Sequence, residues 1–164
     1  MRVIATPADA GAFAPHGAFV EGPALHGDRR LYSDWLTPVA DLHLQFHINS
    51  VAASSLPVTL TRIEKHPHAA QVFVPLQVRR YLVTVLPSDS DGQPDPTGAL
   101  CMIVPGNTGV IYRAGCWHGA VTALDEDAQF AVMMWRGAAD DDMFQPVAPL
   151  MILPSLNEQR GTRS

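Results

Sequence analysis

The chain has 164 residues, of which 47% are hydrophobic and 16% are charged, and its formal net charge is −5. This composition excludes a disordered chain, and the length predicts a single domain, residues 1–164, that buries its own core. The acidic balance argues against nucleic acid or an anionic membrane as a partner, because both are bound by clustered cations. The 12 glycines and 14 prolines indicate many turns, which favours short strands over long helices.

The predicted elements begin with a short Ala-rich helix over residues 8–14 and a loop over residues 22–30. Apolar and polar residues alternate over 42–48, which predicts a half-buried strand whose apolar side chains face the core. Further strands are predicted over residues 58–64, 71–76, 80–86, 100–104, 109–113 and 130–136. The polar stretch over residues 87–98 is predicted to be a long hairpin loop. Because no helical pattern separates the strands, an antiparallel all-β barrel or jelly roll is favoured.

The N-terminal residues, the lengths of the apolar runs and the number of cysteines predict where in the cell the protein is found. No apolar run is long enough to cross a membrane, and residues 1–14 lack the basic and apolar segments of an export signal. We therefore expect a soluble, cytoplasmic protein in which Cys101 and Cys116 are reduced structural thiols. Residues 157–164 are polar and are predicted to form a frayed tail.

Polar residues two apart on a strand are candidate site residues, because alternate side chains of a small β-barrel point into its interior. Glu64 and His66 have this spacing, and Gln71 begins the next predicted strand. A further imidazole, His118, follows a glycine turn far downstream. An alternative register pairs His66 with His68, which fits the spacing to Gln71 less well.

The same residues resemble the two motifs of the cupin superfamily, with Glu64-x-His66-x4-Gln71 as the first and Arg113-x-Gly115-x-x-His118 as the second. The chain also carries a longer series of ordered motifs, namely Leu56-Pro-Val-Thr-Leu, Glu64-Lys-His66-Pro67, Gln71-x-Phe73-x-Pro75-Leu, Tyr81-Leu-Val-Thr-Val, Gly109-Val-Ile-Tyr112 and Gly115-x-Trp117-His118. Over residues 56–137 this series resembles the ureidoglycolate lyase family, long named ureidoglycolate hydrolase.

The resemblance implies a cupin-type double-stranded β-helix with minor short helices, and a homodimer that splits ureidoglycolate into glyoxylate and urea in purine catabolism. Ureidoglycolate is a carbinolamine, so one base and one acid are enough to break its C–N bond. His66 and His118, which we expect to titrate near neutrality, are the candidate acid/base pair. Gln71 and Tyr112 are candidates to hydrogen-bond the ureido group or the developing carbonyl. Arg136 occupies the place of a family arginine and is the candidate to bind the substrate carboxylate.

A divalent metal ion remains open as a cofactor. Glu64, His66, Gln71 and His118 offer nitrogen and oxygen donors that suit nickel, manganese or zinc. Such an ion would polarise the substrate hydroxyl in place of a base. A metal-dependent dioxygenase or isomerase is a weaker interpretation, because the first motif lacks the usual pair of histidines.

Three residues depart from those usual in the family. Ser50 stands where the resemblance implies an arginine, Gly119 where it implies a second histidine, and Trp135 where it implies an aspartate. These departures leave open a divergent cupin that binds or acts on another small 2-hydroxy or 2-oxo acid, with or without lyase activity.

Other polar and aromatic residues are expected to have structural or surface roles. His43 and His47 are expected on the exposed polar face of their strand, and Asp140–Asp142 in a solvated turn. Trp117 and Trp135 are expected to fill the core or an interface.

Overall fold

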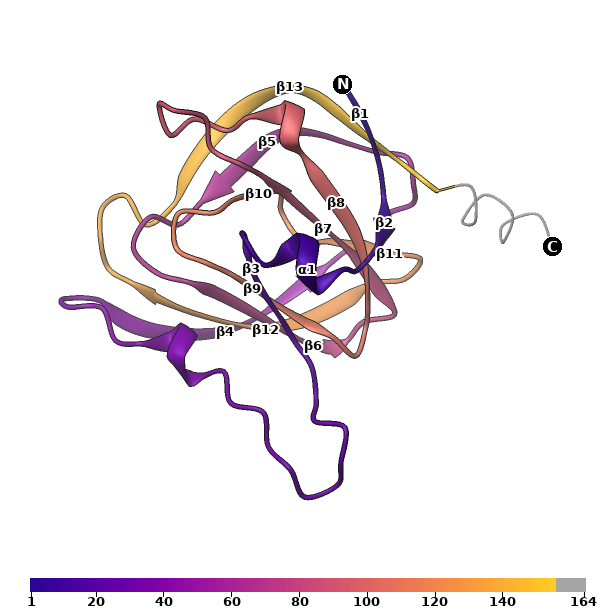
Figure 1. Cartoon of the computed structure of the whole chain (residues 1–164). Coiled ribbons are helices and arrows are strands. Elements are labelled where there is room, and N and C mark those ends of the chain that lie inside the picture. Colours follow the sequence, from indigo (N-terminus) through magenta and orange to yellow (C-terminus); the bar gives the residue numbers. More distant parts are fainter. Residues whose placement is uncertain (156–164) are drawn as a thin grey trace.

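Two β-sheets form a jelly-roll barrel in the computed structural model, which describes residues 1–155 (Figure 1). The larger sheet contains β1 (Arg2–Ile4), β2 (Thr6–Pro7), β5 (Val58–Lys65), β7 (Arg80–Leu86), β8 (Leu100–Pro105), β10 (Trp117–His118), β11 (Thr122–Leu124) and β13 (Met143–Leu153). The smaller sheet contains β3 (Gly17–Val20), β4 (His43–Val51), β6 (Gln71–Gln77), β9 (Gly109–Tyr112) and β12 (Ala128–Arg136). The all-β prediction is confirmed, and the tail predicted for residues 157–164 lies outside the described residues.

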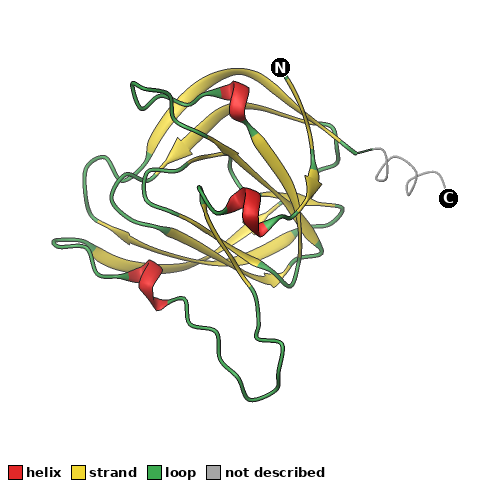
Figure 2. Cartoon of the chain, in the orientation of Figure 1, coloured by secondary structure: helices red, strands yellow, loops and turns green. Residues whose placement is uncertain are grey.

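Short helices are a minor part of the fold, as predicted (Figure 2). They are α1 (Ala10–Phe13), η1 (Ser33–Leu36) and η2 (Pro96–Gly98). The side chain of Asp9 accepts hydrogen bonds from the backbone N–H groups of Gly11 and Ala12, which caps the start of α1. The predicted loop over residues 22–30 lies in the long excursion below the barrel in Figure 1. No helix within residues 1–155 has the length and apolar character needed to span a membrane.

Strand pairing is mostly antiparallel, as the sequence predicts. The exceptions are β1 with β13 and β2 with β8, which pair in parallel. In the smaller sheet β12 lies between β6 and β4, so β4 forms an edge of the sheet (Figure 1). The predicted hairpin loop over residues 87–98 connects the antiparallel strands β7 and β8.

The sequence pattern does not predict β13, the longest strand of the larger sheet. Its alternation is interrupted by Pro146 and Pro149, and proline cannot donate a ladder hydrogen bond. Pairing with β5 shifts its register between Pro146 and Leu150, which accommodates both prolines. The predicted series of strands therefore ended one strand too early.

Strand β4 is confirmed, but the prediction that its apolar side chains face the core is wrong. Leu44, Phe46 and Ile48 are 47%, 65% and 49% exposed, respectively. The opposite face of the strand points inward, where His47 and Asn49 line a cavity. Polar residues therefore occupy the inner positions because the barrel is hollow at this point.

The core between the sheets is largely aromatic and aliphatic. The ring of Phe130 contacts those of Phe73 and Tyr81 edge to face, a geometry that stabilises by about 0.5–1.5 kcal/mol per pair beyond apolar burial. Trp117 is buried, as expected of a core residue, and its indole N–H donates to the carbonyl of Gly92. Cys101 and Cys116 are free and buried, which agrees with the predicted structural thiols.

Candidate active site

Two cross-strand pairs bring the predicted site residues together. Glu64 on β5 lies opposite His118 on β10 in the larger sheet. Gln71 on β6 lies opposite Tyr112 on β9 in the smaller sheet. Directly opposed residues place their side chains on the same face of a sheet. The rings of Tyr112 and His118 then stack across the barrel, 4.0 Å apart and nearly parallel, which joins the two pairs into one cluster.

His66 completes this cluster from the residue that follows β5. Its ring centroid lies 5.2 Å from that of His118. Ligand atoms of Glu64, His66 and His118 all lie within 4.8 Å of one another. The sequence motifs thus identify residues that converge, although they are separated by up to 54 positions in the chain (118 − 64).

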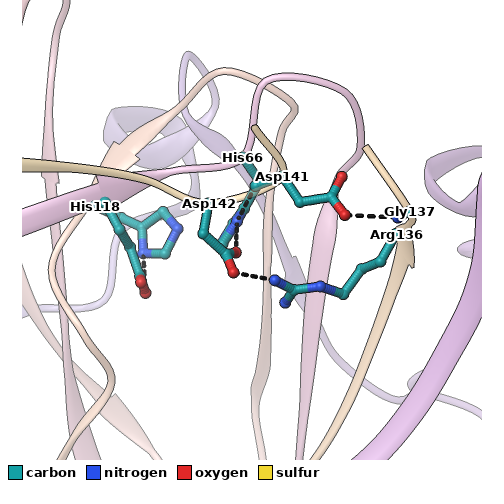
Figure 3. Close-up of polar contacts among 7 residues, drawn as sticks. His66, His118, Arg136, Gly137, Asp141 and Asp142 are labelled. Carbon is teal, nitrogen blue, oxygen red and sulfur yellow. Dashed lines mark hydrogen bonds and ion pairs between the residues drawn. The ribbon is translucent and has the colours of Figure 1, made fainter. Parts of the chain in front are cut away.

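Hydrogen bonds define the tautomers of both histidines. Nδ1 of His66 lies 3.0 Å from the carbonyl oxygen of Asp141, and Nδ1 of His118 lies 3.2 Å from that of Gly119 (Figure 3). A carbonyl oxygen only accepts hydrogen bonds, so Nδ1 carries the proton in each neutral ring. The lone pair of each ring is then on Nε2, which is the atom available to a proton, a metal ion or a substrate.

Four buried polar atoms lack a hydrogen-bond partner within the described residues: His66 Nε2, Gln71 Oε1, Tyr112 Oη and His118 Nε2. Leaving a buried polar group unpaired costs about 1–3 kcal/mol, so folded proteins seldom tolerate it without a functional reason. All four atoms belong to residues that the motifs identified. Their grouping indicates a site that receives a ligand with several polar atoms.

Burial determines the charge states in this cluster. Burial lowers the pKa of His118 to about 3, and the nearby charge of His66 acts in the same direction. His118 is therefore neutral near pH 7, contrary to the expectation that it titrates near neutrality. Burial also raises the pKa of the Glu64 carboxyl, although His66 and nearby arginines oppose this shift. Glu64 thus holds a proton more readily than an ordinary glutamate.

A cavity of about 300 Å³ opens beside the cluster. Its walls are formed by His47, Asn49, Val51, Glu64, His66, Gln71, Phe73, Ala120, Val121, Arg136, Asp142 and Phe144. Arg136, at the end of β12, is the arginine predicted to bind a carboxylate. His118 and Tyr112 do not line this cavity and lie behind its wall, each only 1% exposed.

Residues 1–149 match the family model described as ureidoglycolate lyase. The chain belongs to the ureidoglycolate lyase family. The ureidoglycolate lyase of Mesorhizobium japonicum is 31% identical over 141 residues, which cover 80% of this chain and 85% of that protein. The ureidoglycolate lyase of Azotobacter vinelandii is 30% identical over 148 residues, with coverage of 84% and 88%. A solved structure, a dTDP-6-deoxy-D-glucose-3,5-epimerase from Legionella pneumophila, is 11% identical with a TM-score of 0.46, covering 88% of this chain and 83% of that one.

The three departures from the usual family residues do not lie among the cavity walls. Ser50 and Trp135 alternate with the inward-facing Asn49 and Arg136, so they lie on the outer face of the smaller sheet. At Gly119, a Cβ atom would lie 2.8 Å from Leu60 Cδ1, so a larger residue would require Leu60 to move. The family match favours a lyase over a divergent cupin with another substrate.

The sequence analysis missed three polar residues of the cavity wall, namely His47, Asn49 and Asp142. His47 and Asn49 come from β4, and their alternation with apolar residues was the signal that could have identified them. Asp142 was expected in a solvated turn, but its carboxylate contacts Nδ1 of His66 at 3.0 Å and also pairs with Arg136 (Figure 3). Asp140 fits the solvated turn better, since its carboxylate pairs with the partly exposed His68 at the rim.

The predicted metal ligands suit a divalent ion in their donor chemistry. The unpartnered Nε2 atoms of His66 and His118 and the unpartnered Oε1 of Gln71 are lone-pair donors. With the Glu64 carboxylate they make a set of two nitrogens and two oxygens, which zinc, nickel and manganese accept. Such an ion would supply a Lewis acid that polarises the substrate hydroxyl.

Proposed function

We propose that this protein is a carbon–nitrogen lyase that splits ureidoglycolate into glyoxylate and urea. The observation that carries the proposal is the group of four unpartnered polar atoms beside a cavity that also contains Arg136. Ureidoglycolate offers a hydroxyl, a ureido group and a carboxylate, which matches the polar atoms of the site. Family membership supports the same reaction, and the reaction belongs to purine catabolism in the cytoplasm.

Arg136 is the proposed carboxylate-binding residue. It lies at the cavity wall with its side chain 23% exposed, so a ligand in the cavity can reach it. A guanidinium binds a carboxylate through two parallel N–H donors, which fixes orientation as well as supplying charge. This contact would hold the reacting carbon against Glu64 and His66.

Proton transfer breaks the C–N bond. In our scheme Nε2 of His66 takes the proton of the substrate hydroxyl, and the electron pair of that O–H bond forms the new carbonyl of glyoxylate. The electron pair of the C–N bond leaves with the ureido nitrogen, which takes a proton from Glu64 to give urea. Glu64 suits the acid role because burial raises its pKa and it lines the cavity. The sequence analysis had paired His66 with His118 for proton transfer, but His118 is neutral and lies behind the wall.

Gln71, Tyr112 and His118 have different proposed roles. Burial raises the pKa of the Tyr112 phenol well above its usual value, so its O–H stays protonated and is a donor within the cluster behind the cavity wall. Gln71 Oε1 accepts a hydrogen bond from a ureido N–H. His118 lies behind the wall with its lone pair on Nε2, so we assign it to the set that would hold a metal ion with Glu64, His66 and Gln71.

An assay of both enantiomers of ureidoglycolate tests the proposal. We expect release of equal amounts of urea and glyoxylate from one of them. His66→Gln should lower kcat about 10²- to 10⁴-fold, the range typical of a lost acid or base. The matched control is His68→Gln, which changes a partly exposed imidazole two residues away and should leave kcat within about twofold. Failure of the wild-type protein to release either product from either enantiomer would overturn the proposal.

We also propose that the protein assembles as a homodimer through the outer face of the smaller sheet. The outward side chains of β4 are Leu44, Phe46, Ile48 and Ser50, none of which is charged, and β4 forms a sheet edge. An exposed apolar face beside an open strand edge suits pairing with an identical face. Light scattering coupled to size exclusion measures the mass that decides this.

A further inference from the structure

Asp142 contacts two residues of the proposed site at once. Its Oδ1 lies 3.0 Å from Nδ1 of His66, and its Oδ2 pairs with Nη2 of Arg136 (Figure 3). The proposed base and the proposed carboxylate-binding residue therefore share one carboxylate. Asp142 itself lines the cavity, with its side chain 32% exposed.

The turn that carries Asp142 is fastened independently of its side chain. The carboxylate of Asp141 accepts a hydrogen bond from the backbone N–H of Gly137 at 2.6 Å. The carbonyl of Asp141 accepts from Nδ1 of His66 at 3.0 Å. These contacts hold the backbone between β12 and β13 against His66. A change in the Asp142 side chain alone should therefore leave the turn in place.

The contact with Asp142 leaves most of the Arg136 guanidinium available. A guanidinium has five N–H donors, and the pairing with Asp142 is made through Nη2. The remaining donors can bind a second carboxylate. The negative charge of Asp142 nevertheless offsets part of the positive charge that would attract an anionic substrate.

We propose that Asp142 is a positioning residue that fixes His66 and Arg136 relative to each other while partly neutralising Arg136. This inference rests on the proposed function, because its roles for His66 and Arg136 are taken from it. Asp142 has two effects of opposite sign: it favours turnover by orienting the base, and it weakens binding of the anionic substrate. Loss of a merely structural residue would not produce this combination.

Asp142→Asn separates the two effects, since the amide keeps an acceptor oxygen but loses the charge. We expect kcat to fall about 10-fold, near the lower end of the effect of removing a group that orients a site histidine. We expect KM to fall about threefold, because the charge that competes at Arg136 is gone. Asp142→Ala also removes the acceptor and should lower kcat about 100-fold.

Asp140→Asn is the matched control. It removes the same charge from the same turn, but Asp140 pairs with His68 at the rim, 2.7 Å away, and does not line the cavity. Its kcat and KM should stay within about twofold of wild type. An equal fall in KM for both variants would overturn the inference, because it would show that KM depends on the net charge of the turn and not on the contact between Asp142 and Arg136.

Binding of glycolate, measured by calorimetry, separates this inference from the proposed function. Glycolate has the carboxylate and hydroxyl of the substrate but cannot react. Asp142→Asn should bind it about threefold more tightly than wild type, and this gain should vanish when Arg136→Ala is also present. Tighter glycolate binding by Asp142→Asn, in a protein that has no lyase activity, would support the neutralising effect on Arg136 and overturn the proposed function together with the role in turnover. Unchanged glycolate binding and unchanged kinetics in an active Asp142→Asn enzyme would overturn the inference alone.

Discussion

Strand β4 carries two faces of opposite chemistry, and its neighbour β12 adds Arg136 to the inner one. Their inward face contributes His47, Asn49 and Arg136 to the cavity. Their outward face presents Leu44, Phe46 and other uncharged side chains to the surface. Both faces arise from the same period of two along the chain. The difference teaches that alternation identifies two faces but does not decide which one is buried.

The inner face of β4 is polar because it lines the cavity, whereas the outer face forms no wall of the cavity. This view explains why Ser50 and Trp135 depart from the usual family residues without removing a wall of the cavity. Trp135 has a structural contact of its own, since its indole N–H donates to the carbonyl of Leu36 and fastens η1 to the outside of the sheet. Two adjacent residues of one strand, one on each face, can therefore be substituted separately to compare the inner face with the outer face.

Arg136 and Trp135 form the pair with the largest expected contrast. Arg136→Ala should raise KM for ureidoglycolate about 100-fold, because it removes the cation that binds the carboxylate and leaves the negative charge of Asp142 beside it without that cation. Trp135→Phe loses the hydrogen bond to Leu36 on the outer face and should change KM by less than about twofold. Steady-state kinetics on both variants measures this contrast. A similar rise in KM for the two variants would show that the faces do not act separately.

Sequence patterns predicted the fold well where strands alternate and turns are marked by glycine and proline. The motifs also named Glu64, His66, Gln71, Tyr112 and His118, which the fold brings together: four of them form two cross-strand pairs, and His66 follows β5. Strand β13 was not predicted because its two prolines interrupt the alternation of apolar and polar residues. The register shift that accommodates these prolines depends on pairing with β5, so the local sequence does not indicate it.

The remaining site residues could not be predicted because they depend on contacts between distant parts of the chain. Asp141 and His66 are 75 positions apart, and only the closed barrel places the β12–β13 turn over His66. His47 was expected on the exposed polar face of its strand, and it is exposed, but together with Asn49 it also lines the cavity, which alternation alone does not reveal. The neutrality of His118 likewise follows from burial, which spacing alone does not reveal.

Phe46 tests the outer face directly. Phe46→Asp places a charge at the most exposed apolar side chain of β4 and should weaken dimerisation about 30-fold, as expected for a residue central to an interface. Sedimentation equilibrium measures this change, and circular dichroism checks the fold. A wild-type protein that sediments as a monomer at all concentrations would show that no second copy covers this face.

Asn49 and Ser50 give a smaller contrast on the same strand. Asn49→Ala removes a polar wall of the cavity and should lower kcat/KM about 10-fold, the loss expected for one hydrogen bond to a charged or reacting group. Ser50→Ala changes the outer face by a single hydroxyl and should leave kcat/KM within about twofold. Equal losses at both positions would mean that the strand as a whole, rather than its inner face, supports the site.

Asp125 lies on neither the inner nor the outer face of the smaller sheet. Its substitution therefore measures the effect of a charge change that involves neither face. Hydrogen bonds from Arg80 lower the pKa of Asp125, so the carboxylate stabilises the folded state above the pKa of the unfolded chain. Its backbone has φ of 72°, a conformation that asparagine also tolerates, so Asp125→Asn removes the charge without adding strain. We expect a loss of about 0.5 kcal/mol in the free energy of unfolding at pH 7. The difference from wild type should disappear as the pH falls through the lowered pKa of Asp125, which urea unfolding at several pH values measures. A loss that persists at the acid end would show that the charge of Asp125 is not its cause.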